Sequence, residues 1–197
     1  MQNISPHTIF PLTPDRWIDF ETLFGERGAY SGCWCIYWRM KRSEFMKITG
    51  EDRKASMYNL MASGVVPGLL LYEDGIPIGW CSIGPREDFP RLEHSKTIKR
   101  IDDQPVWSIV CFFINRRFRR QGVMRLLIKG AVDYAQSQGA KIVEAYPTDM
   151  QHPNLEGKKL TGYHGFMGIA SAFRKAGFIE VGRASDYQAI MRYTFSE

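Results

Sequence analysis

The sequence predicts a single domain of the α/β (α+β) class. Composition allows this, because 197 residues that are 44% hydrophobic and 24% charged suit one globular domain with a substantial core. Short apolar runs typical of strands alternate along the chain with segments of helical periodicity.

The first elements follow in a simple order. A strand is expected near Thr8–Leu12, and helices fill the rest of residues 1–65. The segment LLLYEDGIPIGWCSI holds two apolar runs around Asp74-Gly75 and predicts a β-hairpin. After a charged loop over Arg86–Gln104, the nearly all-apolar Val106–Ile114 predicts a buried strand.

An amphipathic helix is expected directly after Gly122, because the apolar residues that follow fall at helical spacing. These residues are Val123, Leu126, Leu127, Ala131, Tyr134 and Ala135. Then come a strand over Lys141–Tyr146, a polar loop over Thr148–His164, and a helix from Ala170. That helix ends at Gly177, where a left-handed backbone carries little penalty, and strands complete the sheet.

The turn before the amphipathic helix is a candidate phosphate site. It reads Arg119-Arg120-Gln121-Gly122-Val123-Met124. Free backbone N–H groups point out of a helix N-terminus, and the helix dipole favours negative charge there. Arginines beside it add charge-assisted hydrogen bonds, although Arg116, Arg117 and Arg120 could equally form a solvated basic loop.

This turn resembles the (Gln/Arg)-x-x-Gly-x-(Gly/Ala) pyrophosphate loop of the GNAT superfamily of N-acetyltransferases. Arg119 and Gly122 match, whereas Met124 departs from the small residue at the last position. A second segment, Phe173–Phe178, is similar to the Lys-x-Gly-Phe turn at the end of a late helix in that family. The resemblance covers about Val66 to Phe195. It implies the acyl-CoA N-acyltransferase fold, in which a central mixed, mostly antiparallel sheet has splayed middle strands and carries helices on both faces.

The resemblance also implies that acetyl-CoA (coenzyme A) is the cofactor. Residues 66–195 would form the acetyl-CoA-binding core of one domain spanning 1–197, and residues 1–65 would shape the acceptor site. Backbone groups of the splayed strand would bind the pantetheine arm, while its side chains remain core residues. The residues expected at the cofactor are Phe112, Phe113, Ile114, Arg119, Arg120, Gln121, Gly122, Val123, Met124, Arg125 and Phe173.

The family's usual proton donor to the departing thiolate is missing. In the pattern Tyr-x-Lys-x-Gly-Phe, the tyrosine position is held by Phe173, which has no hydroxyl. Tyr146, Tyr163 or water is an alternative donor, or the attacking amine passes its own proton to the thiolate. A protein that binds acyl-CoA without fast chemistry is a further alternative.

Glu144 and Tyr146 are the candidate catalytic side chains. Strand alternation places them on one face, and a glutamate within an apolar sheet is costly unless it is paired or functional. Glu144 is therefore a candidate general base, with a salt bridge to an arginine as the competing interpretation. Asp149, where the strand ends, is a further candidate. The resemblance also implies that a backbone N–H near Phe112 stabilises the oxyanion.

The acceptor is expected beside the aromatic segment Tyr30–Arg39. Trp34, Tyr37 and Trp38 are candidate walls of a pocket in which ring faces contact an apolar or cationic amine. Core packing is the competing interpretation for these rings. Cys33-Trp34-Cys35 has no second ligand pair, so no metal is expected.

Charge and composition limit the classes of partner that the protein is expected to bind. A net charge of +5 and a pI of about 9.0 suit an encounter with polyanionic coenzyme A. Motifs of nucleic-acid-binding proteins are missing, so nucleic acid is not expected. The chain shows no apolar run near the roughly 20 residues of a membrane span, no signal peptide and no disulfide-rich pattern. These features predict a cytoplasmic protein without a membrane partner.

The predicted function is acetyl-CoA-dependent N-acetyl transfer to the primary amine of a small molecule. Direct attack in a ternary complex is expected, because proximity supplies much of the rate. The alternatives are an acyl-CoA-binding sensor or interaction module without efficient turnover, and a peptide or protein N-acetyltransferase. The protein is expected to be a monomer or a homodimer.

Overall fold

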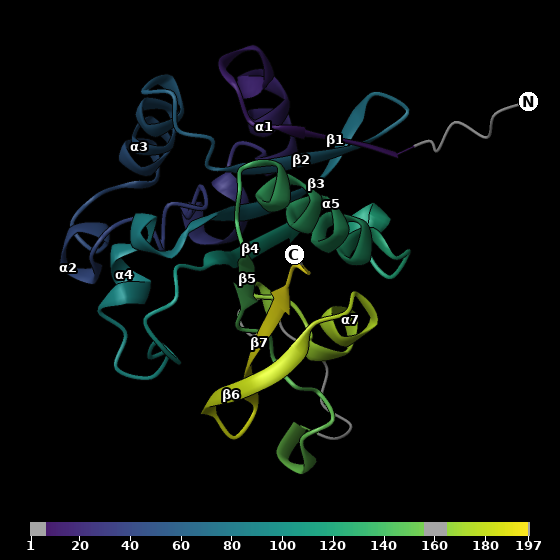
Figure 1. The fold of residues 1–197 in the computed structure, drawn as a ribbon. Helices are drawn as coiled ribbons and strands as arrows, with labels where there is room; N and C mark the ends of the chain where they lie inside the picture. Colours follow the sequence, from purple (N-terminus) through teal and green to yellow (C-terminus); the bar gives the residue numbers. More distant parts are fainter. Residues whose placement is uncertain (1–6, 156–164, 197) are drawn as a thin grey trace, which may run out of the picture.

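The computed structural model describes residues 7–155 and 165–196, which build a seven-stranded sheet with helices on both faces (Figure 1). The strand order is β1-β2-β3-β4-β5-β7-β6, and every neighbouring pair is antiparallel except the parallel pair β4 and β5. The predicted fold class is therefore confirmed. The strands are β1 His7–Pro11, β2 Gly68–Glu73, β3 Ile76–Pro85, β4 Trp107–Ile114, β5 Ile142–Ala145, β6 Ile179–Ser185 and β7 Gln188–Thr194.

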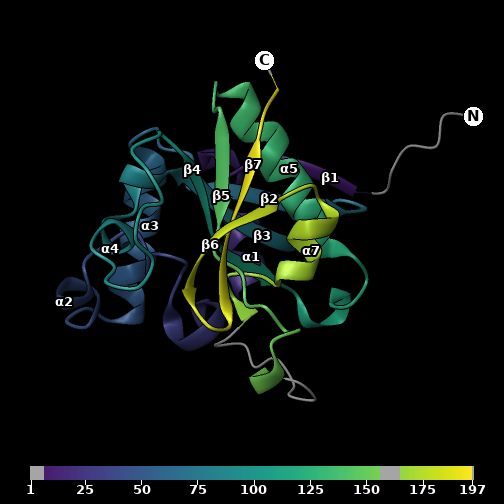
Figure 2. The same ribbon diagram turned by 60° about the horizontal axis from the view of Figure 1, so that its bottom comes forward.

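The helices lie on the two faces of the sheet in two groups. α5 and α7 cover one face, and α2, α3 and α4 lie on the other, where α1 also packs (Figure 2). The α-helices are α1 Trp17–Phe24, α2 Arg42–Phe45, α3 Gly50–Ala62, α4 Pro90–Glu93, α5 Val123–Ser137 and α7 Ala170–Lys175. Short helical turns span Pro14–Arg16, Gly28–Gly32, Arg86–Asp88, Arg116–Phe118 and Pro153–Leu155.

The predicted hairpin is present as β2 and β3. Asp74 and Gly75 both have positive φ, 49° and 79°, which is the backbone geometry that an Asp-Gly hairpin turn requires. The helix predicted after Gly122 is α5, and its buried face packs on the sheet as part of the largest core cluster.

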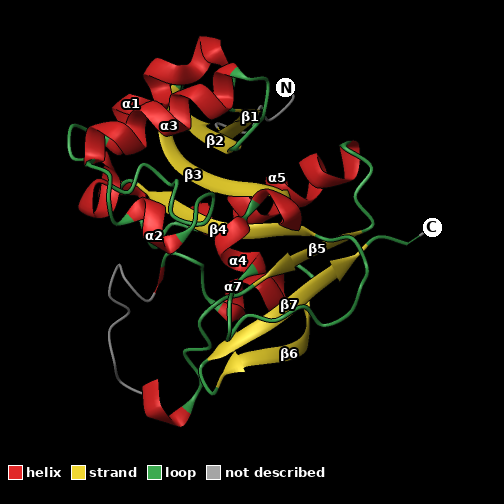
Figure 3. Ribbon diagram, turned by 90° about the vertical axis from the view of Figure 1, so that its left-hand side faces the viewer, coloured by secondary structure: helices red, strands yellow, loops and turns green. Residues whose placement is uncertain are grey.

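The sheet opens between β4 and β5. These strands pair only where Trp107–Ile109 face Val143–Ala145. β4 then continues to Ile114 beside β3, while the chain leaves β5 after Ala145. The two halves of the sheet, β1 to β4 and β5 to β7, can be followed in Figure 3. The expected splay of the middle strands is therefore observed.

The two expected loops differ. The Arg86–Gln104 segment carries α4 and buries Phe89, Leu92 and Ile98 in a core cluster, so it packs as part of the fold. The Thr148–His164 segment is described only as far as Leu155, and Tyr163 lies outside the described residues. Within 7–155 and 165–196, none of the helices is long and apolar enough to cross a membrane.

Candidate active site

The turn before α5 has the geometry of an anion site. Gly122 is the residue before the first turn of α5 and adopts a left-handed backbone, with φ of 83°; Arg120 is also left-handed, at 65°. The Gly122 carbonyl accepts from the N–H of Arg125 at 2.9 Å, which closes the first turn. The first N–H groups of a helix have no partner within it, so those at the start of α5 are available to a ligand.

The arginines of this turn are exposed. None of them forms an ion pair with an acidic side chain in the part of the chain that is described; they are Arg116, Arg117, Arg119, Arg120 and Arg125. The Arg119 Nε donates to the Ile114 carbonyl at 2.9 Å, and the Gln121 side chain donates to the Arg117 carbonyl at 2.9 Å. Met124, the departure from the family pattern, packs at the edge of the main core cluster with buried Val123. The turn thus combines free helix amides with positive charge, which fits a pyrophosphate.

The β4 side chains next to the opening are core residues, as expected. The Phe112 ring meets the Phe173 ring edge-on at 6.0 Å between centroids, and Phe113 packs against Phe24 at 5.1 Å. The backbone of Phe112 holds a contact that the sequence did not indicate. Its N–H donates to the carbonyl of Phe166 at 2.6 Å.

Phe173 occupies the position of the missing tyrosine in the middle of the core. It is fully buried and packs edge-on against Phe178 at 5.0 Å. Gly168 lies against it so closely that a Cβ there would stand 2.8 Å from the Phe173 ring. This position therefore contributes packing and no proton donor.

Glu144 is fully buried and is held on both carboxylate oxygens. Oε1 accepts from the Arg86 Nη1 at 2.9 Å and from the Tyr146 hydroxyl at 2.7 Å. Oε2 accepts from the Arg192 Nε at 2.7 Å. The salt bridge considered as the competing interpretation is therefore present, and the arginines are Arg86 and Arg192.

The network around Glu144 extends to the Arg86–Gln104 segment. Arg192 forms two hydrogen bonds with Asp102, at 2.6 and 3.0 Å, and these hold the pKa of Asp102 at about 2. Burial, and then the neighbouring Glu144 charge, raise the pKa of Tyr146 well above its ordinary value. Tyr146 therefore keeps its proton at neutral pH, and its hydroxyl donates a hydrogen bond to Glu144.

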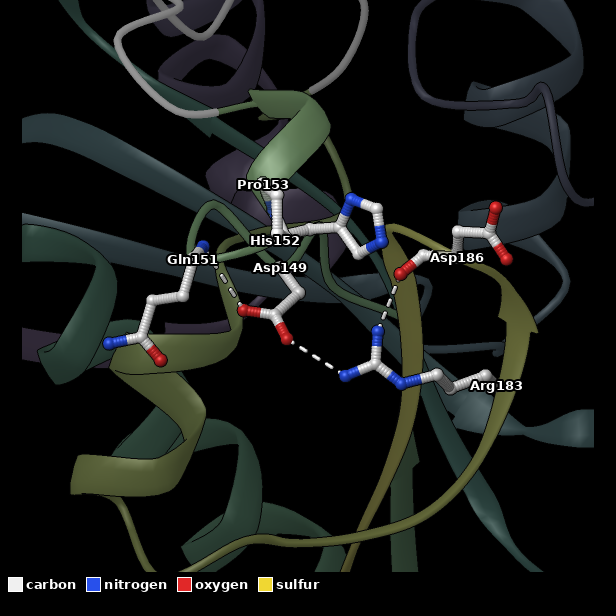
Figure 4. Close-up of a pocket in the computed structure, with 6 residues that line it drawn as sticks. All are labelled: Asp149, Gln151, His152, Pro153, Arg183 and Asp186. Carbon is white, nitrogen blue, oxygen red and sulfur yellow. Dashed lines mark hydrogen bonds and ion pairs between the residues drawn. The ribbon is translucent and has the colours of Figure 1, made fainter.

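Asp149 lies beyond the end of β5, at a polar hollow that Figure 4 shows. Arg183 and Arg174 donate to its carboxylate at 2.9 and 3.1 Å. Burial would raise the pKa of Asp149, but these two hydrogen bonds outweigh it and hold the pKa below its ordinary value. The hollow is lined by Asp149, Gln151, His152, Pro153, Arg183 and Asp186.

The three candidate acceptor aromatics separate into two places. Trp34 is buried in the cluster with α1, where it stacks on Phe24 at 5.9 Å and 11°, so core packing accounts for it. Tyr37 and Trp38 instead pack with Phe166 in the cluster that includes Val110 and Tyr146, where β4 and β5 part. The buried Trp38 Nε1 has no hydrogen-bond partner among the described residues.

The backbone explains this separation. Trp34 and Cys35 both have positive φ, 45° and 58°, so the chain reverses between Trp34 and Tyr37. The Trp80 indole donates to the Cys35 sulfur at 3.0 Å. The four cysteines are free, and no group of His, Cys, Asp or Glu side chains within the described ranges is arranged to hold a metal ion.

Comparison with known proteins agrees with the fold. The chain resembles ribosomal-protein-S5-alanine acetyltransferase from Vibrio fischeri, with 13% identity over 98% of this chain and 94% of that one and a TM-score of 0.52. It also resembles paia N-acetyltransferase from Thermoplasma acidophilum in complex with coenzyme A, with 12% identity, coverages of 96% and 99% and a TM-score of 0.53. No curated protein matches the sequence.

A comparison of the sequence with models of protein families identifies the family. The Acetyltransferase (GNAT) family matches residues 31–177, which begins inside the aromatic segment and ends at the Gly177 turn. This match covers more than half of the chain. The protein therefore belongs to the GNAT family, whose members are N-acetyltransferases, and its cofactor is acetyl-CoA.

Proposed function

We propose that the protein transfers the acetyl group of acetyl-CoA to the primary amine of a small molecule, by direct attack in a ternary complex. One observation carries the acceptor assignment. The half-buried rings of Tyr37 and Phe166 and the buried Trp38 lie together where β4 and β5 part, beside the strand that bears Phe112. Aromatic faces bind apolar or cationic groups, and the Trp38 N–H, which has no partner among the described residues, can donate to a ligand oxygen or nitrogen.

The cofactor assignment rests on the α5 turn and on β4. We assign the pyrophosphate to the first-turn amides of α5 with Arg119, Arg120 and Arg125, and the pantetheine arm to backbone groups of Phe112–Ile114. The Thermoplasma acidophilum protein, which has the same fold, was solved in complex with coenzyme A, and this supports coenzyme A as the ligand. When bound, acetyl-CoA supplies an activated acetyl thioester.

The proton transfers do not depend on Glu144. Its carboxylate is already bonded to two guanidinium groups and a phenol, so it is a poor acceptor for the amine proton. The Tyr146 proton is committed to Glu144. We therefore assign the amine proton to water or to the departing thiolate, and we assign Glu144 and Tyr146 the task of holding β4, β5 and β7 together.

A sensor without efficient turnover is the second candidate. Two observations favour it: Phe173 has no hydroxyl, and the Phe112 N–H that would stabilise the oxyanion is already bonded to Phe166. A sensor would bind acetyl-CoA without releasing coenzyme A above background. The free state of all four cysteines suits a reducing compartment, so the cytoplasm remains the proposed location.

A thiol-release assay separates these candidates. Acetyl-CoA is incubated with the protein and a panel of small amines and of peptides with free N-termini. Small-molecule turnover predicts release with aromatic or apolar amines, and release with peptides alone would favour a peptide acetyltransferase. Tyr37→Ala should raise KM for the active amine about tenfold through lost ring contact. Tyr58→Ala, an exposed tyrosine on α3, is the control.

A further inference from the structure

Phe166 contacts both halves of the proposed site. Its carbonyl accepts the N–H of Phe112 at 2.6 Å on the open edge of β4. Its ring stacks on Trp38, with centroids 6.4 Å apart at 29°, and meets Tyr37 edge-on at 6.2 Å. One residue therefore connects the backbone of the cofactor strand with the acceptor aromatics.

The Phe112 N–H cannot serve two acceptors in full. β4 has lost its β5 partner beyond Ile109, and a buried N–H on that edge needs an acceptor. In the free protein the Phe166 carbonyl supplies it. The proposed function gives the same N–H to the thioester oxygen, which requires the carbonyl to leave.

The segment Gly165–Gly168 is held as a tight turn between β4 and the chain beyond β5. The Gly168 N–H donates to the Gly165 carbonyl at 3.0 Å, and the Gly168 carbonyl accepts from the Thr148 N–H at 3.0 Å. Gly168 has a φ of 89° and lies against the Phe112 and Phe173 rings. A shift of this short turn therefore moves the Phe166 carbonyl and ring together.

We propose that Phe166 is a positioning residue that couples the two halves of the site. Its carbonyl caps the Phe112 N–H in the free protein, and acetyl-CoA displaces the carbonyl and shifts the ring relative to Tyr37 and Trp38. The inference rests on the proposed function. The proposal has a thermodynamic consequence. If most of the free protein has the Phe166 carbonyl on the Phe112 N–H, the apparent Kd for acetyl-CoA equals the intrinsic Kd divided by the fraction of protein in which that N–H is free.

Backbone NMR tests the displacement in the wild-type protein. With ¹⁵N-phenylalanine labelling, acetyl-CoA without an amine should shift the Phe112 and Phe166 amide signals, while the signal of Phe10 on β1 stays unchanged. Calorimetry on the same samples reports binding. Binding with a shifted Phe112 amide but an unshifted Phe166 amide overturns the coupling and leaves the proposed function intact. Binding that shifts neither amide overturns the coupling and also the assignment of the pantetheine arm to β4, and absence of binding overturns the proposed function itself.

A variant pair tests the affinity consequence. Phe166→Ala keeps the carbonyl but removes the ring that anchors it, so the capped state loses stability. The Kd for acetyl-CoA should then fall by about fivefold, the effect of losing roughly one aromatic contact. Phe45→Ala removes another ring from Tyr37, at 5.4 Å, without a bond to β4, and should leave Kd unchanged. An unchanged or higher Kd in Phe166→Ala overturns the proposal, because a merely structural ring would give that result.

Discussion

The two arginine-rich regions of this protein differ in whether their charges have partners. The five arginines around the start of α5 are exposed and lack acidic partners among the described residues. Arg86 and Arg192 are buried, and both are bonded to Glu144. A buried guanidinium must be paired to be tolerated, whereas an exposed one can remain free for a ligand. Whether the arginines are paired, more than their number, therefore distinguishes the part that holds the fold from the part that we propose to bind the cofactor.

The largest expected effect is the loss of the buried charge at Glu144. Glu144→Gln leaves Arg86 and Arg192 without their shared carboxylate, so the free energy of unfolding should fall by about 3–5 kcal/mol. Urea denaturation measures this change. Glu87→Gln is the matched control, because Glu87 pairs with Arg100 at 2.7 Å but is 57% exposed, and it should cost less than about 1 kcal/mol.

This variant also separates the two interpretations of Glu144. If Glu144 were only a general base, Glu144→Gln would lose turnover but would unfold at the same urea concentration as the wild-type protein. That outcome would contradict the structural role assigned here to the network.

A second effect concerns the backbone of the cofactor turn. Gly122→Val places a β-branched residue at a φ of 83°, where nothing lies within 4 Å of the new Cβ, so the penalty is conformational rather than steric. The α5 amides should shift, and the Kd for acetyl-CoA should rise by at least about tenfold. Calorimetry measures it.

Gly139→Val is the control for this change. Gly139 has the same φ of 83° and equally open surroundings just beyond the other end of α5. Both variants should lose similar stability, and only Gly122→Val should lose cofactor affinity. Equal affinities in the two would mean that the α5 turn does not bind the pyrophosphate.

The smallest expected effect comes from one exposed arginine of the α5 turn. Arg120→Gln should raise the Kd for acetyl-CoA about threefold to tenfold at low salt, and the difference from wild type should shrink at high salt because an exposed charge is screened. Arg27→Gln, an exposed arginine away from the turn, should show no difference. If the affinity of Arg120→Gln for acetyl-CoA were lower by the same factor at low and high salt, the side chain would act through the structure of the turn and not through its charge.

Local patterns predicted the parts of the molecule that local physics determines. The Asp74-Gly75 turn, the helix after Gly122 and the left-handed Gly177 after α7 follow from residues that are neighbours in sequence, and the structure has all three. The partners of Glu144 could not be found in this way. Arg86 lies 58 residues from Glu144 and Arg192 lies 48, so only the strand order brings them together.

The surroundings of the proposed acceptor, Tyr37, Trp38 and Phe166, could not be predicted from the sequence for a second reason. The run from Cys33 to Trp38 has neither strand nor helix periodicity, because left-handed residues at Trp34 and Cys35 reverse the chain. Trp34 and Trp38 therefore enter different core clusters although they are four residues apart. The hydrogen bond from the Phe112 N–H to the Phe166 carbonyl could not be predicted from residue types, because every residue has a backbone carbonyl.

Thermal unfolding with acetyl-CoA tests the central claim most directly. If the exposed arginines and the α5 turn hold the cofactor, acetyl-CoA at about a hundred times its Kd should add about 2.7 kcal/mol to the free energy of unfolding and raise Tm by roughly 5–10 °C. Gly139→Val should show the same rise, and Gly122→Val should show about half of it or less, because a tenfold higher Kd leaves about 1.4 kcal/mol of stabilisation at the same acetyl-CoA concentration. An unchanged Tm of the wild-type protein at millimolar acetyl-CoA would contradict the account.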